Sequence, residues 1–340
     1  MKLYGRDLIK ALSDVYAPSG SEEMAAELIK EQLGNDAIVE IDRVGNVIAK
    51  ICGGDQSKRT MICANMDEPG FIVRDIDGEG RVWPKFFGGI PTERISGRLG
   101  VINGDIRCIF SAKPIHFVSG SERTAPTPAD RIYAEAGLSN KEKAEERVSL
   151  GDMGAFYPSF SEIGRYIKGK ALGSRSACYV LIEMIRKIKN DNIALSGDVY
   201  FVFATRGCIG GMGANVAANV IAPTRALMID ATKAFDTHGV SDKDVLTRLG
   251  GGAAILACDG RSIFDGDMCA SAIEYAKNND VKYQYVALST NDGVGQAVQR
   301  ALGGCKCGAI SIPTRHHKSA SEMVSEADIS AVIEIALSLV

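Results

Sequence analysis

The spacing of hydrophobic residues near the start of the chain predicts two amphipathic helices. Apolar side chains recur every three or four residues over 8–15 and again over 24–33, as one face of a helix requires. These stripes are Leu8, Ile9, Leu12 and Val15, then Met24, Leu28, Ile29 and Leu33. Between them, Ser19 and Glu22 stand at capping-box spacing, so residues 17–23 are expected to cap the second helix.

Further along, the pattern changes to that of strands. Residues 38–41 and 47–51 are β-like runs joined by a turn-rich segment, which predicts a hairpin. Residues 59–64 form an apolar run ending at Asn65, as a buried strand does. From about Pro69 to Gly164, short β-like runs alternate with Gly and Pro, and helical periodicity is weak. This alternation of short β-like runs with Gly and Pro predicts a small β-barrel or β-sandwich.

After Gly169, strand-like and helix-like segments alternate. The pattern predicts helices at 175–189, 211–220, 265–278 and 293–302 and from about 323, with strands at 198–204, 225–230, 253–257, 283–288 and 308–312. Such alternation is typical of an α/β domain with a largely parallel sheet. We therefore expect an α/β domain of residues 1–68 and 165–340, interrupted by a β module of residues 69–164.

Composition narrows the functional classes. A chain of 340 residues with 46% hydrophobic and 24% charged residues favours two structural units of ordinary globular type. Its net charge of −3 gives no electrostatic case for nucleic acid or an anionic membrane as partner. No apolar segment approaches the ~20 residues that span a bilayer. Nine cysteines without CxxC pairs are typical of a reducing cytoplasm, and only four histidines weigh against a metalloenzyme.

Several spaced motifs occur in one order along the chain. They cover residues 65–71, 169–175, 205–214, 226–232 and 313–319, with shorter matches at 17–20, 42–46, 113–116 and 250–253. On these motifs the chain resembles, over nearly its whole length, the two-metal aminopeptidases that include tetrahedral aminopeptidase, glutamyl aminopeptidase and the proteins once labelled cellulase M. The resemblance implies a phosphorylase/hydrolase-like α/β peptidase domain that carries an inserted β-barrel oligomerisation domain, and hence a homo-oligomer.

The resemblance also implies which positions would hold the reaction centre, and most of them are altered. Asn65 stands where the family has a metal-binding His, while Asp67, two residues later, is kept. Gly173 stands where an Asp bridges both metals, and Gly207 and Cys208 replace the general base and a ligand Glu. Lys318 replaces the last metal-binding His, and Asp230 is the one metal ligand that is retained.

These replacements predict that no metal pair binds at the family site. A bridging carboxylate holds two dications about 3.5–4 Å apart, and glycine has no side chain to do this. Buried carboxylates left unpaired are costly, so we expect the Lys318 ammonium to replace the metal charge by pairing with Asp230, Asp67 or both.

Other residues near these positions leave alternatives open. Cys208 is either a nucleophile or soft ligand, or a small side chain entering a loop. His316 and His317 either rescue metal binding by a register shift or form an ordinary loop pair. Arg175 and Arg315 either bind an anion or make structural ion pairs.

Three functions follow. The preferred one is a catalytically impaired or inactive peptidase homologue that keeps its cleft for a peptide or amino acid, or for regulation. The second is an active hydrolase with one divalent metal, such as zinc, held among Asp67, Cys208, Asp230 and His316 or His317. The third is a structural assembly component with a vestigial cleft.

Overall fold

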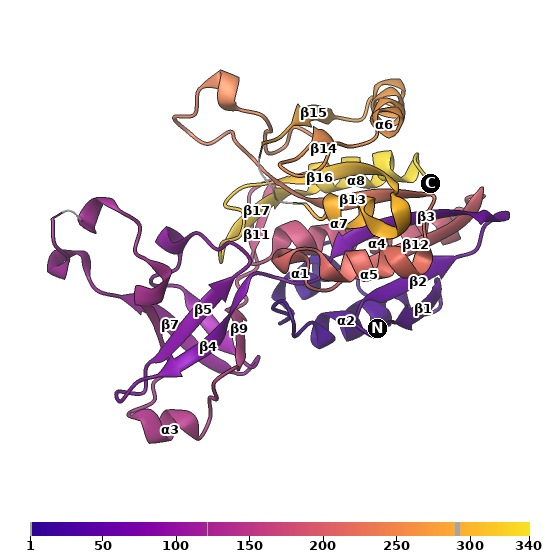
Figure 1. Cartoon of the computed structure of the whole chain (residues 1–340). Coiled ribbons are helices and arrows are strands. Elements are labelled where there is room, and N and C mark those ends of the chain that lie inside the picture. Colours follow the sequence, from indigo (N-terminus) through magenta and orange to yellow (C-terminus); the bar gives the residue numbers. More distant parts are fainter. Residues whose placement is uncertain (1, 121, 290–292) are drawn as a thin grey trace.

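An eight-stranded sheet organises the larger part of the computed structural model, which describes residues 2–120, 122–289 and 293–340 (Figure 1). In spatial order its strands are β1 (Ile38–Ile41), β2 (Val47–Ile51), β12 (Gly197–Ala204), β3 (Asp55–Asn65), β13 (Arg225–Lys233), β16 (Lys306–Thr314), β14 (Ala253–Cys258) and β15 (Tyr283–Ala287). Strands β12, β3, β13 and β16 run parallel, whereas β2 and β14 lie antiparallel beside them. The predicted mixed, largely parallel sheet is therefore confirmed.

The central strands are almost continuously buried, not alternately buried and exposed. In β16, eight consecutive residues from Cys307 to Thr314 are buried. This pattern is expected where helices cover both faces of a parallel sheet. Long apolar runs in the sequence therefore mark the middle of the sheet.

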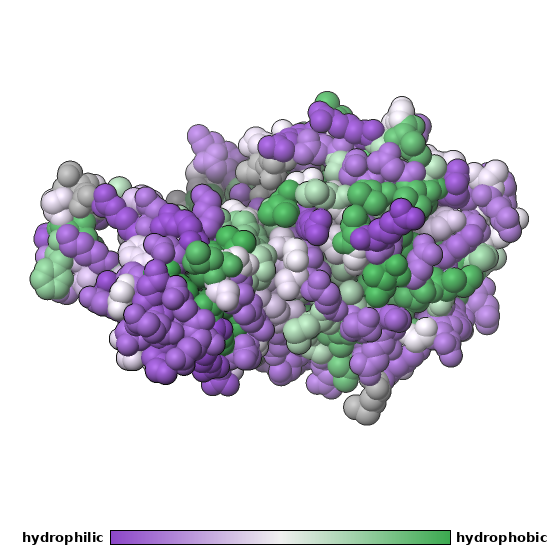
Figure 2. All heavy atoms as spheres, turned by 60° about the horizontal axis from the view of Figure 1, so that its bottom comes forward, coloured by the Kyte–Doolittle hydropathy of each residue, from purple (hydrophilic) through white to green (hydrophobic). Residues whose placement is uncertain are grey.

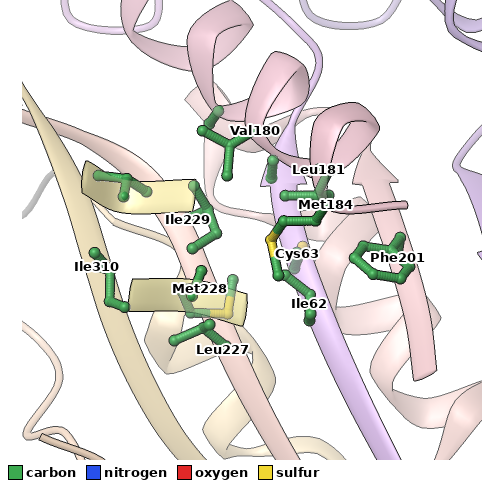
Figure 3. Packing of buried hydrophobic residues seen from close by; sticks show 14 of the residues in the cluster. Ile62, Cys63, Val180, Leu181, Met184, Phe201, Leu227, Met228, Ile229 and Ile310 are labelled. Carbon is green, nitrogen blue, oxygen red and sulfur yellow. The ribbon is translucent and has the colours of Figure 1, made fainter. Parts of the chain in front are cut away.

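Helices pack against this sheet and against one another. They are α1 (Gly5–Asp14), α2 (Glu23–Leu33), α3 (Lys141–Glu145), α4 (Leu172–Asn190), α5 (Met212–Ile221), α6 (Gly266–Asn278), α7 (Gly295–Gln299) and α8 (Glu326–Leu337). The longest, α4, contacts β3, β13 and β16 and is flanked by α1 and α8. Figure 3 shows Val180, Leu181 and Met184 of α4 above side chains of β3 and β13. None of the described helices combines the length and apolar character needed to cross a membrane.

The remaining strands mostly close a barrel, which stands at one end of the molecule in Figure 1. Its strands are β4 (Gly70–Ile76), β5 (Val82–Phe87), β8 (Ile132–Glu135), β7 (Ile106–Ala112), β6 (Leu99–Ile102) and β9 (Met153–Phe156), in spatial order. Its core contains Phe110, whose ring lies 5.3 to 6.0 Å from those of Phe71, Phe86 and Phe156. The barrel alternative of the predicted β module is thus confirmed.

A third, three-stranded sheet joins distant parts of the chain. It contains β10 (Ser161–Ile163), β11 (Tyr166–Gly169) and β17 (Glu322–Ser325). Residues 161–163 therefore lie outside the barrel, although the sequence texture grouped them with it. The domain boundaries at 68/69 and 164/165 stay a prediction.

Three local predictions were wrong. The closing helix starts at Glu326, because residues 322–325 form β17 instead. The helix expected over 293–302 is the shorter α7 followed by a 3-10 turn, in which Leu302 has a φ of 41°. The capping box is absent: α2 begins at Glu23 without a side-chain cap, and Ser19 hydrogen-bonds to Asp67 instead.

We predict that Phe110→Ala lowers the free energy of unfolding of the barrel by about 3–5 kcal/mol, because it leaves a cavity among the clustered rings. The measurement is urea denaturation followed by the fluorescence of Trp83, which lies on β5. Phe117→Ala is the matched control, because that side chain is 67% exposed. Equal denaturation midpoints for the two variants would contradict this packing.

Candidate functional site

One cavity of about 110 Å³ lies where the parallel strands of the large sheet end, and it collects most of the residues singled out in the sequence. Asn65 ends β3, Cys208 follows β12, and Asp230 lies in β13. His317 and Lys318 come from the turn after β16. The carboxyl ends of neighbouring parallel strands meet at one edge of a sheet, which is why these distant motifs converge.

The loop that follows β5 of the barrel lies close to two residues that line this cavity. A Cβ added to Gly88 would lie 3.3 Å from Cys208 Cβ, and one added to Gly89 would lie 3.4 Å from Lys318 Nζ. Both glycines have φ near +80°, a conformation that other residues rarely adopt. The loop after β5 therefore comes directly against the residues that line the cavity.

The Asp67 carboxylate is buried and organises the loops behind the cavity. Its Oδ2 accepts hydrogen bonds from Ser19 Oγ and, at 2.9 Å, from the Cys208 backbone N–H. Its Oδ1 has no hydrogen-bond partner among the described residues. Of the two partners predicted for the Lys318 ammonium, Asp67 is thus already held by other groups. Asp230 lines the cavity together with Lys318, and their pairing stays a proposal.

Cys208 presents a protonated thiol to the cavity. Burial raises its pKa well above the usual value, and the neighbouring Asp67 carboxylate raises it further, which outweighs the opposite effect of Lys318. Because the thiolate is the reactive form, this environment disfavours a nucleophile.

Two glycines in the site stand where an added Cβ would approach a neighbour too closely. Gly173 is the second residue of α4, and a Cβ there would lie 2.6 Å from Ala231 Cβ and 3.4 Å from the His317 ring. Gly207 follows β12, and a Cβ there would lie only 2.2 Å from Asn65 Cγ. Real Cβ atoms essentially never approach other atoms as closely as 2.2 or 2.6 Å. The space beside each glycine is therefore filled by its neighbours.

Glu322, at the start of β17, fixes this arrangement and was missed in the sequence. Its buried carboxylate accepts hydrogen bonds from the backbone N–H groups of Gly173 at 2.8 Å and Lys318 at 2.5 Å. His317 Nδ1 lies 3.4 Å from the same carboxylate. The only feature of the sequence that could have pointed to Glu322 is its position: an acidic residue four positions after Lys318, in a segment otherwise made of small residues.

Three predicted candidates lie elsewhere. The Arg315 guanidinium donates to Asp236 Oδ2 at 2.9 Å, and His316 is exposed, with its pKa lowered by partial burial and by nearby Arg94 and Arg315. Arg175 is fully buried, and its guanidinium lies 3.7 Å from Glu68 Oε1. Both arginines therefore make structural ion pairs.

The sequence and the fold place this cavity in a known family. Residues 45–335 match the model of the M42 glutamyl aminopeptidase family. The chain belongs to this family. It is 27% identical over 327 residues to the glutamyl aminopeptidase of Lactococcus lactis, which covers 91% of this chain and 88% of that protein. The resemblance inferred from the spaced motifs is confirmed.

Solved structures of M42-like peptidases share the whole fold. The TET aminopeptidase of Thaumarchaeota archaeon SCGC AB-539-E09 superposes with a TM-score of 0.94 at 29% identity, over 98% of this chain and 94% of that one. The TET1 peptidase of Pyrococcus horikoshii gives a TM-score of 0.85 at 26% identity, over 98% of each chain. That protein assembles into a tetrahedron or a large octahedral shell.

M42 peptidases are metallopeptidases that need divalent metals, and a pair of such ions needs a bridging ligand. Gly173 contributes only a backbone N–H, which is a donor and cannot bridge metals. Asn65 is a neutral amide whose Nδ2 faces Asp230 Oδ2 at 3.4 Å. Across the described residues, no three His, Cys, Asp or Glu side chains gather closely enough to hold a metal.

We predict that Gly173→Ala lowers the free energy of unfolding by about 1–3 kcal/mol, because its Cβ overlaps that of Ala231. Adding Ala231→Gly removes the overlap and is expected to recover part of that loss. Gly266→Ala is the matched control, since a Cβ at that helix start meets no atom within 4 Å. The measurement is urea denaturation followed by circular dichroism, and a Gly173→Ala variant as stable as the control would contradict the filled site.

Alkylation tests the state of the Cys208 thiol. With iodoacetamide at pH 8, we expect mass spectrometry to detect modification of exposed Cys52 well before Cys208, because the raised pKa of Cys208 leaves little thiolate. Modification of Cys208 at the rate of Cys52 would show an activated thiol.

Proposed function

We propose that this chain binds a peptide or an amino acid in the cavity and does not hydrolyse peptides by the two-metal mechanism of its family. The observation that carries the proposal is the filled space beside Gly173 and Gly207, the positions that correspond to the bridging carboxylate and the general base. A missing side chain alone would leave a hole that water or a metal could enter. Here a side chain at Gly173 meets Ala231 Cβ, and one at Gly207 requires the Asn65 side chain to move.

Charge supports the same proposal. In an active relative, two dications neutralise the acidic ligands. In this chain Lys318 brings one ammonium into the cavity that Asp230 lines, so the charge that remains there is balanced without a metal. An ammonium in the same cavity also opposes the binding of a pair of divalent metal ions.

The single-metal alternative has one observation in its favour, namely that His317, Cys208 and Asp230 line the same cavity. Two observations weigh against it: His317 faces Glu322, and Asp67 is held by Ser19. A purely structural role leaves the polar lining of the cavity unexplained.

Assembly is part of the proposal. M42-like relatives form closed shells, and this chain exposes large apolar side chains that a homo-oligomer would cover. Figure 2 shows hydrophobic patches among hydrophilic residues on one face of the molecule. Two of the exposed apolar side chains are Phe117, which is 67% exposed, and Val220, which is 70% exposed. A cytoplasmic location remains a prediction from cysteine usage.

The test combines metal analysis, turnover and ligand binding. After incubation with Zn²⁺ or Co²⁺ and dialysis, we expect less than one metal ion per chain. Release of the N-terminal residue from unblocked peptides should be at least ~10²–10⁴ times slower than for an active relative, because the general base is missing. Short unblocked peptides should raise the melting temperature by mass action.

The Asp230→Asn variant distinguishes peptide hydrolysis in this cavity from hydrolysis by a contaminating peptidase. Turnover that persists in this variant comes from another peptidase, since Asp230 is the retained acidic group of the site. Turnover that a chelator abolishes, and that Asp230→Asn also abolishes, would overturn the proposal in favour of an active metalloenzyme. A melting temperature unchanged by any peptide would favour the purely structural role.

A further inference from the structure

A second, smaller cavity continues from the first one past Asp230. Both cavities share Asp230, Gly293 and Val294 in their walls. The smaller cavity has a volume of about 20 Å³, which is room for one group the size of a water molecule. Gly293 stands at the junction, and a Cβ there would lie 2.9 Å from Asp259 Oδ2.

The walls of the smaller cavity are mostly apolar, being formed by side chains that include Leu256, Phe264 and Leu288. Such walls exclude water from the polar groups among them and strengthen electrostatic interactions there. An unbranched methylene chain that enters from the main cavity would therefore contact apolar side chains.

Two polar groups in this cavity lack hydrogen-bond partners among the described residues. Asp259 Oδ1 caps a turn by accepting from the backbone N–H groups of Arg261 and Ser262 at 2.8 and 2.7 Å. Its Oδ2 is buried and makes no hydrogen bond within the described part of the chain. Thr232 is only 2% exposed, and its hydroxyl likewise has no partner there. Buried polar atoms without partners are rare, and a carboxylate oxygen is the costliest kind.

We propose that this smaller cavity is a subsite for a primary ammonium at the end of an unbranched chain, such as the side chain of a lysine residue. An ammonium has three N–H donors and is close to a water molecule in size. Asp259 Oδ2 and the Thr232 hydroxyl accept two of them. A planar guanidinium or a branched end is too large for this volume. The subsite rests on the proposed function, because it requires a ligand in the main cavity.

The experiment compares two dipeptides by isothermal titration calorimetry, Lys-Ala and norleucyl-Ala. Their side chains are nearly equal in length, and only the first ends in an ammonium. We expect Lys-Ala to bind at least about tenfold more tightly, because a hydrogen bond to a charged group in a dry site is worth that much or more. Arg-Ala should bind no more tightly than norleucyl-Ala.

Asp259→Asn is the decisive variant. It keeps the Oδ1 acceptor of the turn and removes the charge at Oδ2, so the tenfold preference should disappear while norleucyl-Ala binds as before. Gly293→Ala should do the same by placing its Cβ against Oδ2. The matched control is Asp267→Asn, because that carboxylate is 93% exposed on α6 and is not part of the proposed subsite. It should keep the preference.

The outcomes separate the two proposals. If both dipeptides bind equally, or if Asp259→Asn keeps the preference, the subsite proposal fails and the ligand-binding function stands; a bound water then occupies the smaller cavity. If neither dipeptide binds and no other peptide does, the proposed function fails as well. Chelator-sensitive hydrolysis of either dipeptide would overturn the proposed function alone.

Discussion

The carboxylate of Glu322 sets the geometry on which the cavity depends. Because its two oxygens accept from the backbone of Gly173 and of Lys318, it holds the start of α4 and the turn after β16 at one fixed separation. Removing one partner of a buried charged hydrogen bond leaves an unsatisfied group, which makes such a connection hard to loosen. With this separation fixed, the His317 ring lies over Gly173, and no larger residue fits at the bottom of the site.

Close neighbours occupy the space beside two glycines of the site. Asn65 fills the space beside Gly207, and Ala231 fills the space beside Gly173. The sheet and the barrel are those of the M42 family, but activity depends on the groups at the strand ends and not on the fold. A side chain at Gly173 would meet Ala231 Cβ, and one at Gly207 would require the Asn65 side chain to move.

Much of the fold could be predicted from the sequence, because long helices and buried strands carry their own periodicity. The errors arose where a distant partner decides the local structure. Ser19 has the spacing of a capping residue, yet its hydroxyl binds Asp67, 48 positions away. Residues 322–325 look helical by pattern, yet they pair with β11. Motif order identified most of the residues of the cavity, whereas Glu322 and Asp259 carry no local signal that separates them from surface acids.

The contact between the barrel loop and the cavity has one more consequence. Because Gly88 and Gly89 lie against Cys208 and Lys318, the barrel loop supports two residues of the cavity from outside. A shortened form of the chain without the insert would leave Cys208 and Lys318 without this packing. The barrel lies beside the cavity because it is inserted into the chain next to the end of β3.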